Sequence, residues 1–504
     1  MFRVLRIFLI VGSFMIFMNP KVDAAVRQEN GDKTGYAQLE FYQPDEIQSV
    51  HLTISESDRR RMLNALPECI YVPATFQWRN VELDKVAVRF KGNSSSQPKQ
   101  KHKRSYLVRF DKYETNQRFL GLQRVSFDNG VQFGSLFSEP VITEILKAEG
   151  IKSHRCNYAT VYLNDEYQGV YVNVERIDHT FLENNFPNAN GGLWKNDLGG
   201  PGGNFAFIGD DPKQYEKTFE SKNKASKNRM ELVDFIRKIN QASDDDFAAI
   251  LDSTMNVDQL FRITAVMLLS GAFDQLTGWN AHNFYLFHET ERLRWHYLPW
   301  DLDVGFCETA FGRLRVLKDW DAAWPVPAGC SNPLLDRVIS DPELLNRYRT
   351  IATEVLEKHF RPENICESID KKYDLIKRHL EADPFPKQRA TVPGDVGYAE
   401  IVNSMKLFMR KRYASAKQQL AQPGSRPVSK PQGLNNGRGV PAELISKIQR
   451  VEGNAKQMQL KMRQLQQIMP QVNAHLQRGE YAEADRLLSK AIEISGGATE
   501  IEKR

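Results

Sequence analysis

The chain has 504 residues, of which 41% are hydrophobic and 26% are charged, so it can bury one large core and carry an appendage. Its formal net charge is only +5, and acidic and basic residues are interspersed along it. The basic run over residues 99–104 has no aromatic residues interleaved with it, and the composition therefore argues against nucleic-acid binding.

The first 24 residues have the pattern of a secretory signal peptide. Arg3 and Arg6 precede an apolar run over residues 7–18, and small residues precede a cleavage position ahead of Ala25. The run is about a dozen residues long, which is too short for a bilayer span of ~20 residues. We therefore expect an exported protein, periplasmic, secreted or at the cell surface, without stable membrane insertion after cleavage. An uncleaved anchor is the alternative.

Five cysteines accompany this export signal: Cys69, Cys156, Cys307, Cys330 and Cys366. They allow at most two disulfides, and the absence of a C-x-x-C pair argues against a zinc site. A bridge between Cys307 and Cys330 would hold the loop that follows the acidic motif described below, although spacing alone does not determine connectivity.

The first part of the chain is predicted to be rich in strands. Residues 84–91 and 105–110 alternate as strands, residues 134–149 have helical periodicity before Gly150, and residues 158–174 form a hairpin. Between the first two strands lies a basic run that includes Lys103 and Arg104. It either approaches phosphate groups or forms a solvated cationic loop.

The second part begins with charged helical segments and then an apolar helix over residues 258–270, which Gly271 is expected to end. Asp274 lies in the loop that follows. Strands are predicted over residues 284–287 and 293–298.

Asp301 and Asp303 follow the last of these strands. Two carboxylates spaced i and i+2 on an extended chain point to the same side, with Leu302 packed behind them. Mg²⁺ takes one or two carboxylates from a protein and completes its shell with waters and phosphates, so the pair predicts phosphoryl transfer. The alternative is a turn in which the aspartates only accept backbone hydrogen bonds.

The order of these elements adds to the argument. A buried helix, a loop with Asp and Asn, a hairpin and a strand that ends in Asp follow one another as in the catalytic lobe of a protein kinase. The motifs G-x-G-x-x-G, H-R-D and D-F-G are all missing from the sequence. Only the arrangement therefore supports a kinase interpretation.

At this point the chain resembles the CotH kinase family, the spore coat protein H family of atypical, secreted or surface-associated kinase-like proteins. The segments that carry the resemblance are residues 88–95 (VRFKGNSS), 103–106 (KRSY), 161–171 (VYLNDEYQGVY), 175–178 (ERID), 282–287 (HNFYLF) and 299–303 (PWDLD). Their order and spacing make the resemblance specific, although Cys307 stands where the family pattern has a glycine.

The resemblance implies an α+β, atypical two-lobed protein-kinase-like fold over residues 45–420, with lobes at about 45–175 and 176–420. It implies Asp274 as the catalytic residue that handles the acceptor hydroxyl. Asp301, Asp303 and Asn283 would hold Mg²⁺ or Mn²⁺, and ATP would be the second cofactor.

Five further residues are implied to bind the nucleotide, and they are Arg89, Lys91, Lys103, Glu144 and Glu175. Lys103 has the position of the lysine that meets the phosphates. Glu139 and Glu144 are the two candidates for the helix glutamate that steadies it, and we expect Glu139 to lie at the surface.

Beyond the lobes, residues 422–441 are rich in Pro, Gly, Ser and Asn and predict a linker. Residues 442–495 carry an apolar stripe at helical spacing, which predicts a helical hairpin or coiled coil that binds a partner or self-associates.

The functional prediction is an exported kinase that transfers the γ-phosphate of ATP to serine or threonine of a protein substrate. One alternative is a non-catalytic surface, coat or envelope binding protein that retains the scaffold. Another is a metal-dependent hydrolase that uses the same carboxylates.

Overall fold

The computed structural model describes residues 38–426, apart from residues 93–94, 100–102, 131–134, 279–280, 313, 328–329, 386–388 and 390, and scattered residues between 468 and 489. The chain divides into two units, Met1–Pro431 and Gln432–Arg504. The predicted signal peptide lies outside the described residues, as do most of the predicted linker and helical hairpin.

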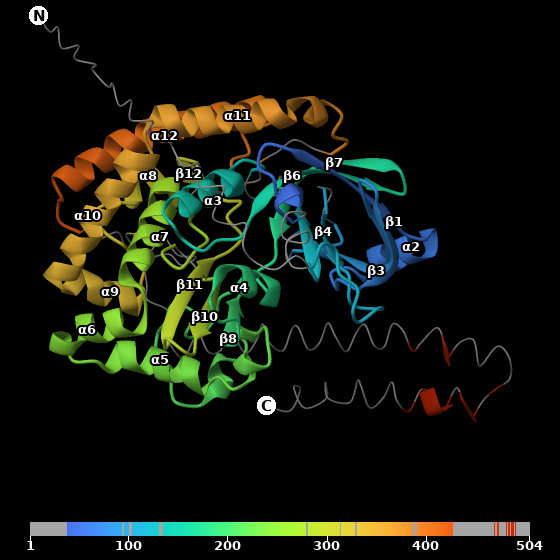
Figure 1. Ribbon diagram of the computed structural model, residues 1–504, viewed down its shortest axis with the longest axis horizontal. Coiled ribbons are helices and arrows are strands. Elements are labelled where there is room, and N and C mark those ends of the chain that lie inside the picture. Colours follow the sequence, from blue (N-terminus) through green and yellow to red (C-terminus); the bar gives the residue numbers. More distant parts are fainter. Residues whose placement is uncertain are drawn as a thin grey trace, which may run out of the picture. The chain divides into compact units, whose positions relative to one another are not determined.

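Seven strands of the first unit close a barrel in the order β1-β2-β3-β4-β5-β7-β6 (Figure 1). Neighbouring strands pair antiparallel except β1 and β6, whose parallel pairing closes the barrel. Alternate side chains fill its interior, including Val50, Val88, Val108 and Val161. The strands are β1 (Ile47–Thr53), β2 (Val72–Trp78), β3 (Val81–Lys91), β4 (Ser105–Arg109), β5 (Arg124–Asp128), β6 (Cys156–Leu163) and β7 (Glu166–Glu175).

Two helices interrupt the barrel sequence, α2 (Glu56–Ala65) and α3 (Ser138–Ala148). Helix α2 packs on β2 of the barrel. Helix α3 also contacts β6, but its apolar face joins the other buried cluster of the molecule, which contains α7. Helix α3 therefore connects the barrel to the helices that follow.

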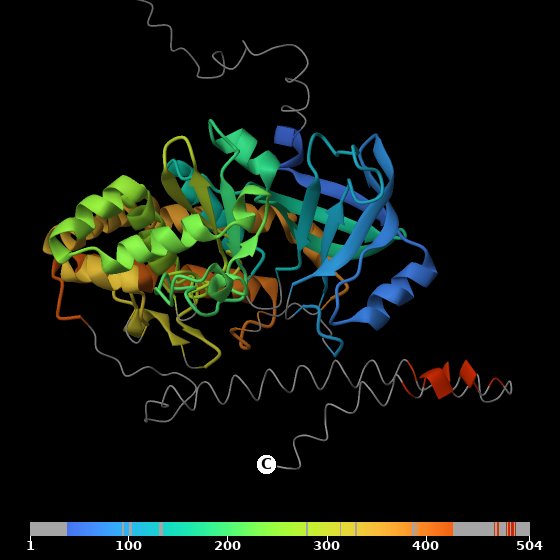
Figure 2. The ribbon, with the colours of Figure 1, turned by 90° about the horizontal axis from the view of Figure 1, so that it is seen from below.

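A helix-rich part surrounds a second sheet of order β11-β10-β8-β9, and Figure 2 shows it beside the barrel. Its strands are β8 (Gly192–Asn196), β9 (Glu220–Ser221), β10 (Phe284–Glu289) and β11 (Arg294–Pro299), with a small pair β12 (Thr309–Ala310) and β13 (Leu314–Arg315). Its helices are α4 (His179–Asn185), η1 (Pro212–Tyr215), η2 (Ala225–Lys227), α5 (Met230–Gln241), α6 (Asp244–Thr254), α7 (Val257–Ser270), α8 (Val316–Asp319), α9 (Pro333–Ser340), α10 (Pro342–His359), α11 (Pro362–Glu381) and α12 (Tyr398–Ala421).

Helix α7 lies at the centre of this part and packs against α3, α10 and α12. Asn256 caps its N-terminus by accepting a hydrogen bond from the backbone N–H of Gln259. Gly271 ends it with φ +70°, and a Cβ there would lie 2.9 Å from Val316 Cγ1. Only glycine suits that position, so the predicted helix end is confirmed.

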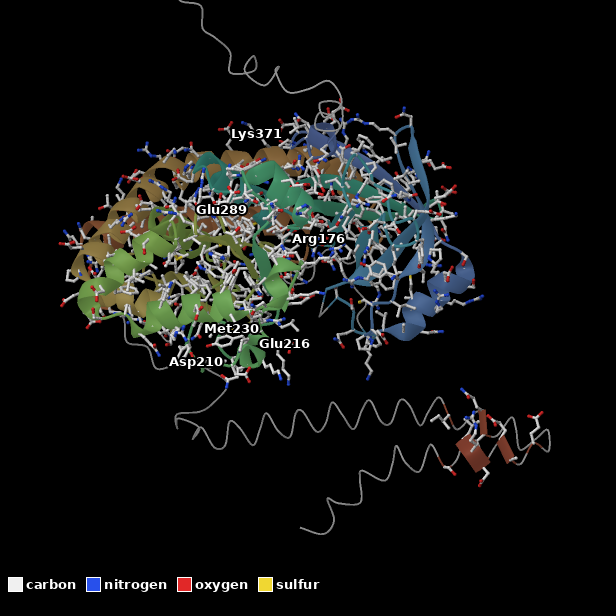
Figure 3. The ribbon with its side chains drawn as sticks, turned by 60° about the horizontal axis from the view of Figure 1, so that its bottom comes forward. Arg176, Asp210, Glu216, Met230, Glu289 and Lys371 are labelled. Atoms are coloured by element: carbon white, nitrogen blue, oxygen red, sulfur yellow. The ribbon has the colours of Figure 1, made fainter. Side chains whose placement is uncertain are left out.

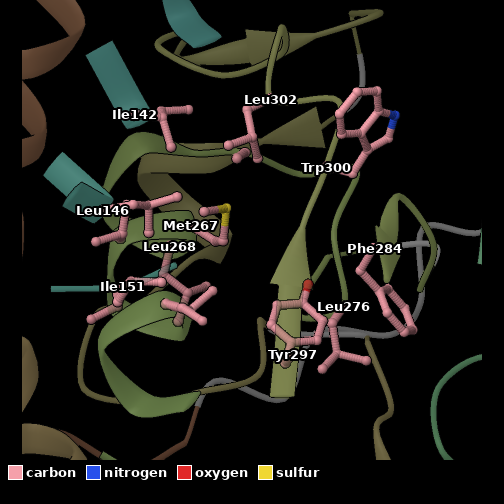
Figure 4. Packing of buried hydrophobic residues seen from close by; sticks show 14 of the residues in the cluster. Ile142, Leu146, Ile151, Met267, Leu268, Leu276, Phe284, Tyr297, Trp300 and Leu302 are labelled. Atoms are coloured by element: carbon pink, nitrogen blue, oxygen red, sulfur yellow. The ribbon is translucent and has the colours of Figure 1, made fainter. Parts of the chain in front are cut away.

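The cluster around α7 also receives the segment after β11. Figure 4 shows Ile142 of α3, Met267 and Leu268 of α7, and Trp300 and Leu302 of that segment within it. Each of these side chains is at most 2% exposed. Leu302 is thus buried between the two aspartates that flank it in the sequence, as predicted.

The α+β class predicted from the sequence is confirmed, and the predicted strands and helices before residue 300 are present. The barrel closure was not predicted. The Cys307–Cys330 bridge is wrong, because all five cysteines are free thiols. Among the described residues, the structure contains no helix that is both long and apolar enough to cross a membrane.

An ion-pair cluster ties α3 to α7 and α10 at the carboxylate of Glu149. This side chain is 2% exposed and accepts from Arg262 Nη1 at 2.6 Å, Lys358 Nζ at 2.8 Å and His359 Nε2 at 2.5 Å. Burial alone would raise the pKa of Glu149, but the hydrogen bonds from Lys358, His359 and Arg262 outweigh it and lower the pKa to about 2.

Because the pKa of Glu149 is lower in the folded chain than its ordinary value, its stabilising effect is present above about pH 4.5 and is lost as the pH falls towards 2. We expect Glu149→Gln to lower the free energy of unfolding at pH 7 by about 2 kcal/mol, after allowance for solvent screening. Urea titrations at pH 7 and pH 3 measure this. Glu144→Gln, on the exposed face of α3, is the control, and an equal loss in both variants would contradict the assignment.

Candidate functional site

One cavity of about 370 Å³ is lined by strands of the barrel and by loops of the helix-rich part. Four cationic side chains and five carboxylates face it, together with His282, Asn283 and Trp300. The cations are Arg89, Lys91, Arg176 and Lys195, and the carboxylates are those of Asp128, Asp197, Asp274, Asp301 and Asp303.

The structure brings together most of the site residues predicted from the sequence. The predicted catalytic residue Asp274, the predicted metal ligands Asn283, Asp301 and Asp303, and the predicted nucleotide-binding residues Arg89 and Lys91 all line this cavity. The predicted residues Lys103, Glu144 and Glu175 are not among its lining residues.

Asp301 and Asp303 share the cavity through a turn rather than through an extended strand. Strand β11 ends at Pro299, and Asp301 has φ +59°. The Trp300 peptide is fixed on both sides, because its N–H donates to Asn283 O at 2.9 Å and its carbonyl accepts from Gln275 Nε2 at 2.8 Å. The extended backbone expected here is wrong, while the convergence of the two carboxylates is observed.

These two carboxyl groups are crowded by negative charge. Burial raises the pKa of Asp301 to about 6, against the opposing effect of Lys91. Burial and then the neighbouring charge of Asp301 raise the pKa of Asp303 well above its usual value, and Glu139 contributes to both shifts. Within the described chain neither carboxylate makes an ion pair.

The donor set of this turn fits a hard divalent cation. In the described part of the chain, no group of three or more His, Cys, Asp or Glu side chains is arranged to hold a metal ion. Two carboxylates with one amide oxygen, however, match the few protein ligands that Mg²⁺ takes when phosphates and waters complete its shell. A bound cation would also relieve the repulsion between Asp301 and Asp303.

Asp274 is held between two neighbours from the start of β10. The Asn283 Nδ2 donates to the Asp274 carbonyl at 3.2 Å and to its Oδ2 at 3.3 Å. The His282 Nε2 lies 3.3 Å from Asp274 Oδ1. With the amide nitrogen of Asn283 on Asp274, its carbonyl oxygen is the atom suited to ligate a metal. Asn283 therefore links the predicted catalytic residue Asp274, to which its nitrogen donates, with the predicted metal site, towards which its oxygen is available.

Both lysines that line the cavity have carboxylate partners. Lys91 at the end of β3 pairs with Asp128 at the end of β5, and Lys195 on β8 pairs with Asp197. Ser126 Oγ also donates to the Asp128 carboxylate at 3.1 Å. Both lysines are largely buried, and the paired aspartates offset the free energy of desolvating their charges at the cavity wall.

The indole of Trp300 gathers three cations. The guanidinium carbon of Arg176 lies 4.6 Å from its ring centroid, and the ammonium nitrogens of Lys195 and Lys91 lie at 5.6 and 6.0 Å. Cation–π attraction favours this arrangement, most strongly for the close guanidinium. Trp300, which directly precedes Asp301, thus contacts three of the four cationic side chains that line the cavity.

Lys103 has a different environment from the one predicted. Its side chain is fully buried, and its Nζ donates to Asp383 Oδ2 at 2.6 Å and to Val170 O at 2.6 Å. A Cβ on Gly169 would lie 2.3 Å from the same carboxylate, so the close approach requires glycine. Lys103 ties the barrel to the segment after α11, and the solvated-loop alternative is wrong for it as well.

The predicted acidic partners also lie elsewhere. Glu144 is exposed on α3 and pairs with Lys372, and Glu175 is buried against Arg155 at 2.5 Å. Glu139, expected at the surface, is 1% exposed, with its Oε1 2.8 Å from His154 Nε2. The reason is helical spacing, since Glu139 shares the inward face of α3 with Ile142.

Sequence reasoning missed several residues of the cavity. Arg176, His282 and Trp300 stand inside the segments that carried the family resemblance, so they could have been found there. Asp128 and Lys195 had no local signal. Only the packing of β5 and β8 at the cavity brings them to it.

Comparison with known proteins relates the chain to one family. A family model described as CotH kinase protein matches residues 88–416, which include all residues named above as lining the cavity. The chain is also 22% identical over 340 residues to inner spore coat protein H of Bacillus subtilis (strain 168), and the match covers 67% of this chain and 88% of that protein.

A raised carboxyl pKa destabilises the folded chain at neutral pH, because the stability linked to it is full below about pH 4 and is lost as the pH rises through the folded-state pKa. Asp303→Asn should therefore raise the free energy of unfolding of the metal-free protein at pH 7 and change it little at pH 4. Urea titrations with a chelator measure both values. The exposed variant Asp210→Asn is the control, and a destabilised Asp303→Asn at pH 7 would refute the charge crowding.

Proposed function

Because the chain belongs to the CotH kinase protein family, we propose that it transfers the γ-phosphate of ATP to serine or threonine of a protein, with Mg²⁺ or Mn²⁺ as cofactor. One observation carries the proposal. Asp274, Asn283, Asp301 and Asp303 line a single cavity, and cations capable of meeting phosphates line the same cavity.

The fold is consistent with a two-lobed kinase-like arrangement. The barrel has its own buried cluster, and the helix-rich part has another. The cavity receives Lys91 and Asp128 from the barrel and Asp274 and Asp301 from the helix-rich part. In this proposal the barrel corresponds to the lobe that covers the nucleotide, and the helix-rich part carries the catalytic loops.

Asp301, Asp303 and Asn283 would hold the metal ion. When bound, such an ion neutralises phosphate charge and aligns the phosphates for transfer. The crowded carboxylates and the amide oxygen supply hard ligands, and Leu302 locks the turn by its burial. Asp301 and Asp303 serve as ligands here rather than as proton acceptors.

Asp274 would orient the acceptor hydroxyl and accept its proton. Its side chain is 28% exposed, so an incoming serine or threonine can reach it. His282 and Asn283 restrict the carboxylate to one orientation, which reduces the cost of positioning the acceptor.

Lys91, rather than Lys103, is the lysine that we propose meets the nucleotide phosphates. It lines the cavity beside Arg89, whereas Lys103 is enclosed with Asp383. Lys91 is paired with Asp128. A phosphate oxygen would compete with the Asp128 carboxylate for the Lys91 ammonium and could replace it when the nucleotide binds.

We also propose that the protein acts outside the cytoplasm, at the coat or envelope. A protein related by sequence is named as an inner spore coat protein, and the N-terminal residues have the pattern of an export signal. We propose that the substrate is a coat or envelope protein, modified before export ends or with a local supply of nucleotide. The segment over residues 442–495 is proposed to bind a partner or a second copy.

The test is transfer of labelled γ-phosphate by the purified mature chain with Mg²⁺ and an extract of envelope proteins. Labelled serine or threonine in protein is expected, because Asp274 and the metal ligands act on transfer itself. Asp274→Asn and Asp301→Asn should each lower the rate by at least about 100-fold. Lys91→Met should raise KM for ATP, and thermal melts verify that each variant is folded.

Asp211→Asn, at an exposed position outside the cavity, is the matched control and should keep full activity. Release of free phosphate without labelled protein would instead indicate a metal-dependent hydrolase. Failure of the intact chain to bind ATP in the presence of Mg²⁺ would overturn the enzyme and leave a binding scaffold.

A further inference from the structure

Arg176 follows directly after β7, where the chain leaves the barrel, and Figure 3 shows it between the barrel and the helix-rich part. Its guanidinium carbon lies 4.6 Å from the Trp300 ring centroid, and its Nη2 donates to the Tyr285 hydroxyl at 3.3 Å. Two neighbours from the helix-rich part therefore fix the plane of this side chain at the cavity wall.

No carboxylate in the described part of the chain pairs directly with Arg176. Lys91 and Lys195 each pair with an aspartate, but Arg176 makes no ion pair with any described residue. Its Nε is buried, and none of the residues that the structure describes accepts a hydrogen bond from it. An anionic ligand in the cavity that Arg176 lines would supply a direct partner for this charge.

The chemistry of the group limits what this ligand can be. A guanidinium carries five N–H donors in a planar fork and no acceptor, so its partner must be an anion or a strong acceptor. The fork matches two oxygens of a phosphate, which a lysine ammonium cannot do in the same way. Because Trp300 immediately precedes Asp301, the fork is supported by the same turn that holds the proposed metal ligands.

We propose that Arg176 binds the phosphate chain of the nucleoside triphosphate, with Trp300 and Tyr285 holding its fork in place. This inference rests on the proposed function, which it extends from the metal ligands to the anion that they would share. It also divides the work among the cations. Arg176 supplies the directional hydrogen bonds. Lys91 and Lys195 supply positive charge, but each must first release its aspartate before it can bind a phosphate oxygen.

The experiment uses calorimetric binding to the full mature chain. The probes are ATP with Mg²⁺, ATP with a chelator, and inorganic tripolyphosphate with a chelator. Arg176→Lys keeps the charge and loses the fork, so we expect about tenfold weaker binding of all three probes, and a larger loss in Arg176→Met. In the transfer assay, Arg176→Lys should raise KM for ATP more than it lowers kcat.

Arg124→Lys is the matched control. Arg124 begins β5 and also has a buried Nε without a hydrogen-bond partner, but it does not line the cavity. Its replacement should leave binding of all three probes unchanged. Thermal melts of both lysine variants verify that they are folded, and Tyr285→Phe, which removes only one support, should weaken binding by about two- to fivefold.

The outcomes separate this inference from the proposed function. Phosphate transfer with unchanged binding in folded Arg176→Lys would overturn the role of Arg176 and leave the kinase in place. Tripolyphosphate binding that depends on Arg176, without any phosphate transfer, would support the anion site and count against the kinase. If the unmodified chain binds none of the probes, the inference fails together with the nucleotide site.

Discussion

The turn that follows β11 depends on three backbone hydrogen bonds to separate parts of the chain. The N–H of Trp300 donates to Asn283 O at 2.9 Å, the carbonyl of Asp303 accepts from the N–H of Ser135 at 3.0 Å, and the N–H of Phe306 donates to Ser270 O at 2.7 Å. These bonds link the turn to the start of β10, the approach to α3 and the end of α7. Since Asp301 takes a left-handed backbone, the surrounding contacts must hold it there.

That constraint explains how acidic groups can be crowded without disrupting the fold. Two carboxylates that repel each other in a partly enclosed space would separate if their backbone were free to move. The buried side chain of Leu302 and the backbone bonds prevent this separation. The protein thus retains a local destabilisation at a site where a cation would be stabilising, as is common where function and stability compete.

The positive side of the cavity is built from residues that are far apart in the chain. Lys91 comes from β3, Arg176 follows β7 and Lys195 lies on β8, yet all three approach one indole. Trp300 carries this contact, and its neighbour Asp301 faces the same cavity. Positive and negative groups are therefore positioned by one turn, so a shift of that turn would move both together.

Much of this architecture follows from local chemistry. The apolar periodicity of α7 with Gly271 at its end, the β6–β7 hairpin, and the Asp301–Asp303 motif were all readable in the sequence, because short-range sterics and burial determine them. Of the nine site residues predicted from the sequence, the cavity brings together six, namely Arg89, Lys91, Asp274, Asn283, Asp301 and Asp303. All of these except Asp274 lie in the segments that carry the family resemblance.

The sequence by itself determined the elements and the acidic motif, whereas the tertiary structure decided which charges meet. Lys103 and Asp383 are 280 residues apart, and the parallel pairing that closes the barrel joins Ile47 of β1 to Tyr158 of β6. Helical spacing puts Glu139 and Glu144 on different faces of α3, and the packing of α3 decides which of these faces is buried. The positions of charged side chains in the sequence follow no period that would identify their partners. A buried charge needs a partner of opposite sign or a hydrogen bond, and only the completed fold brings that group to it.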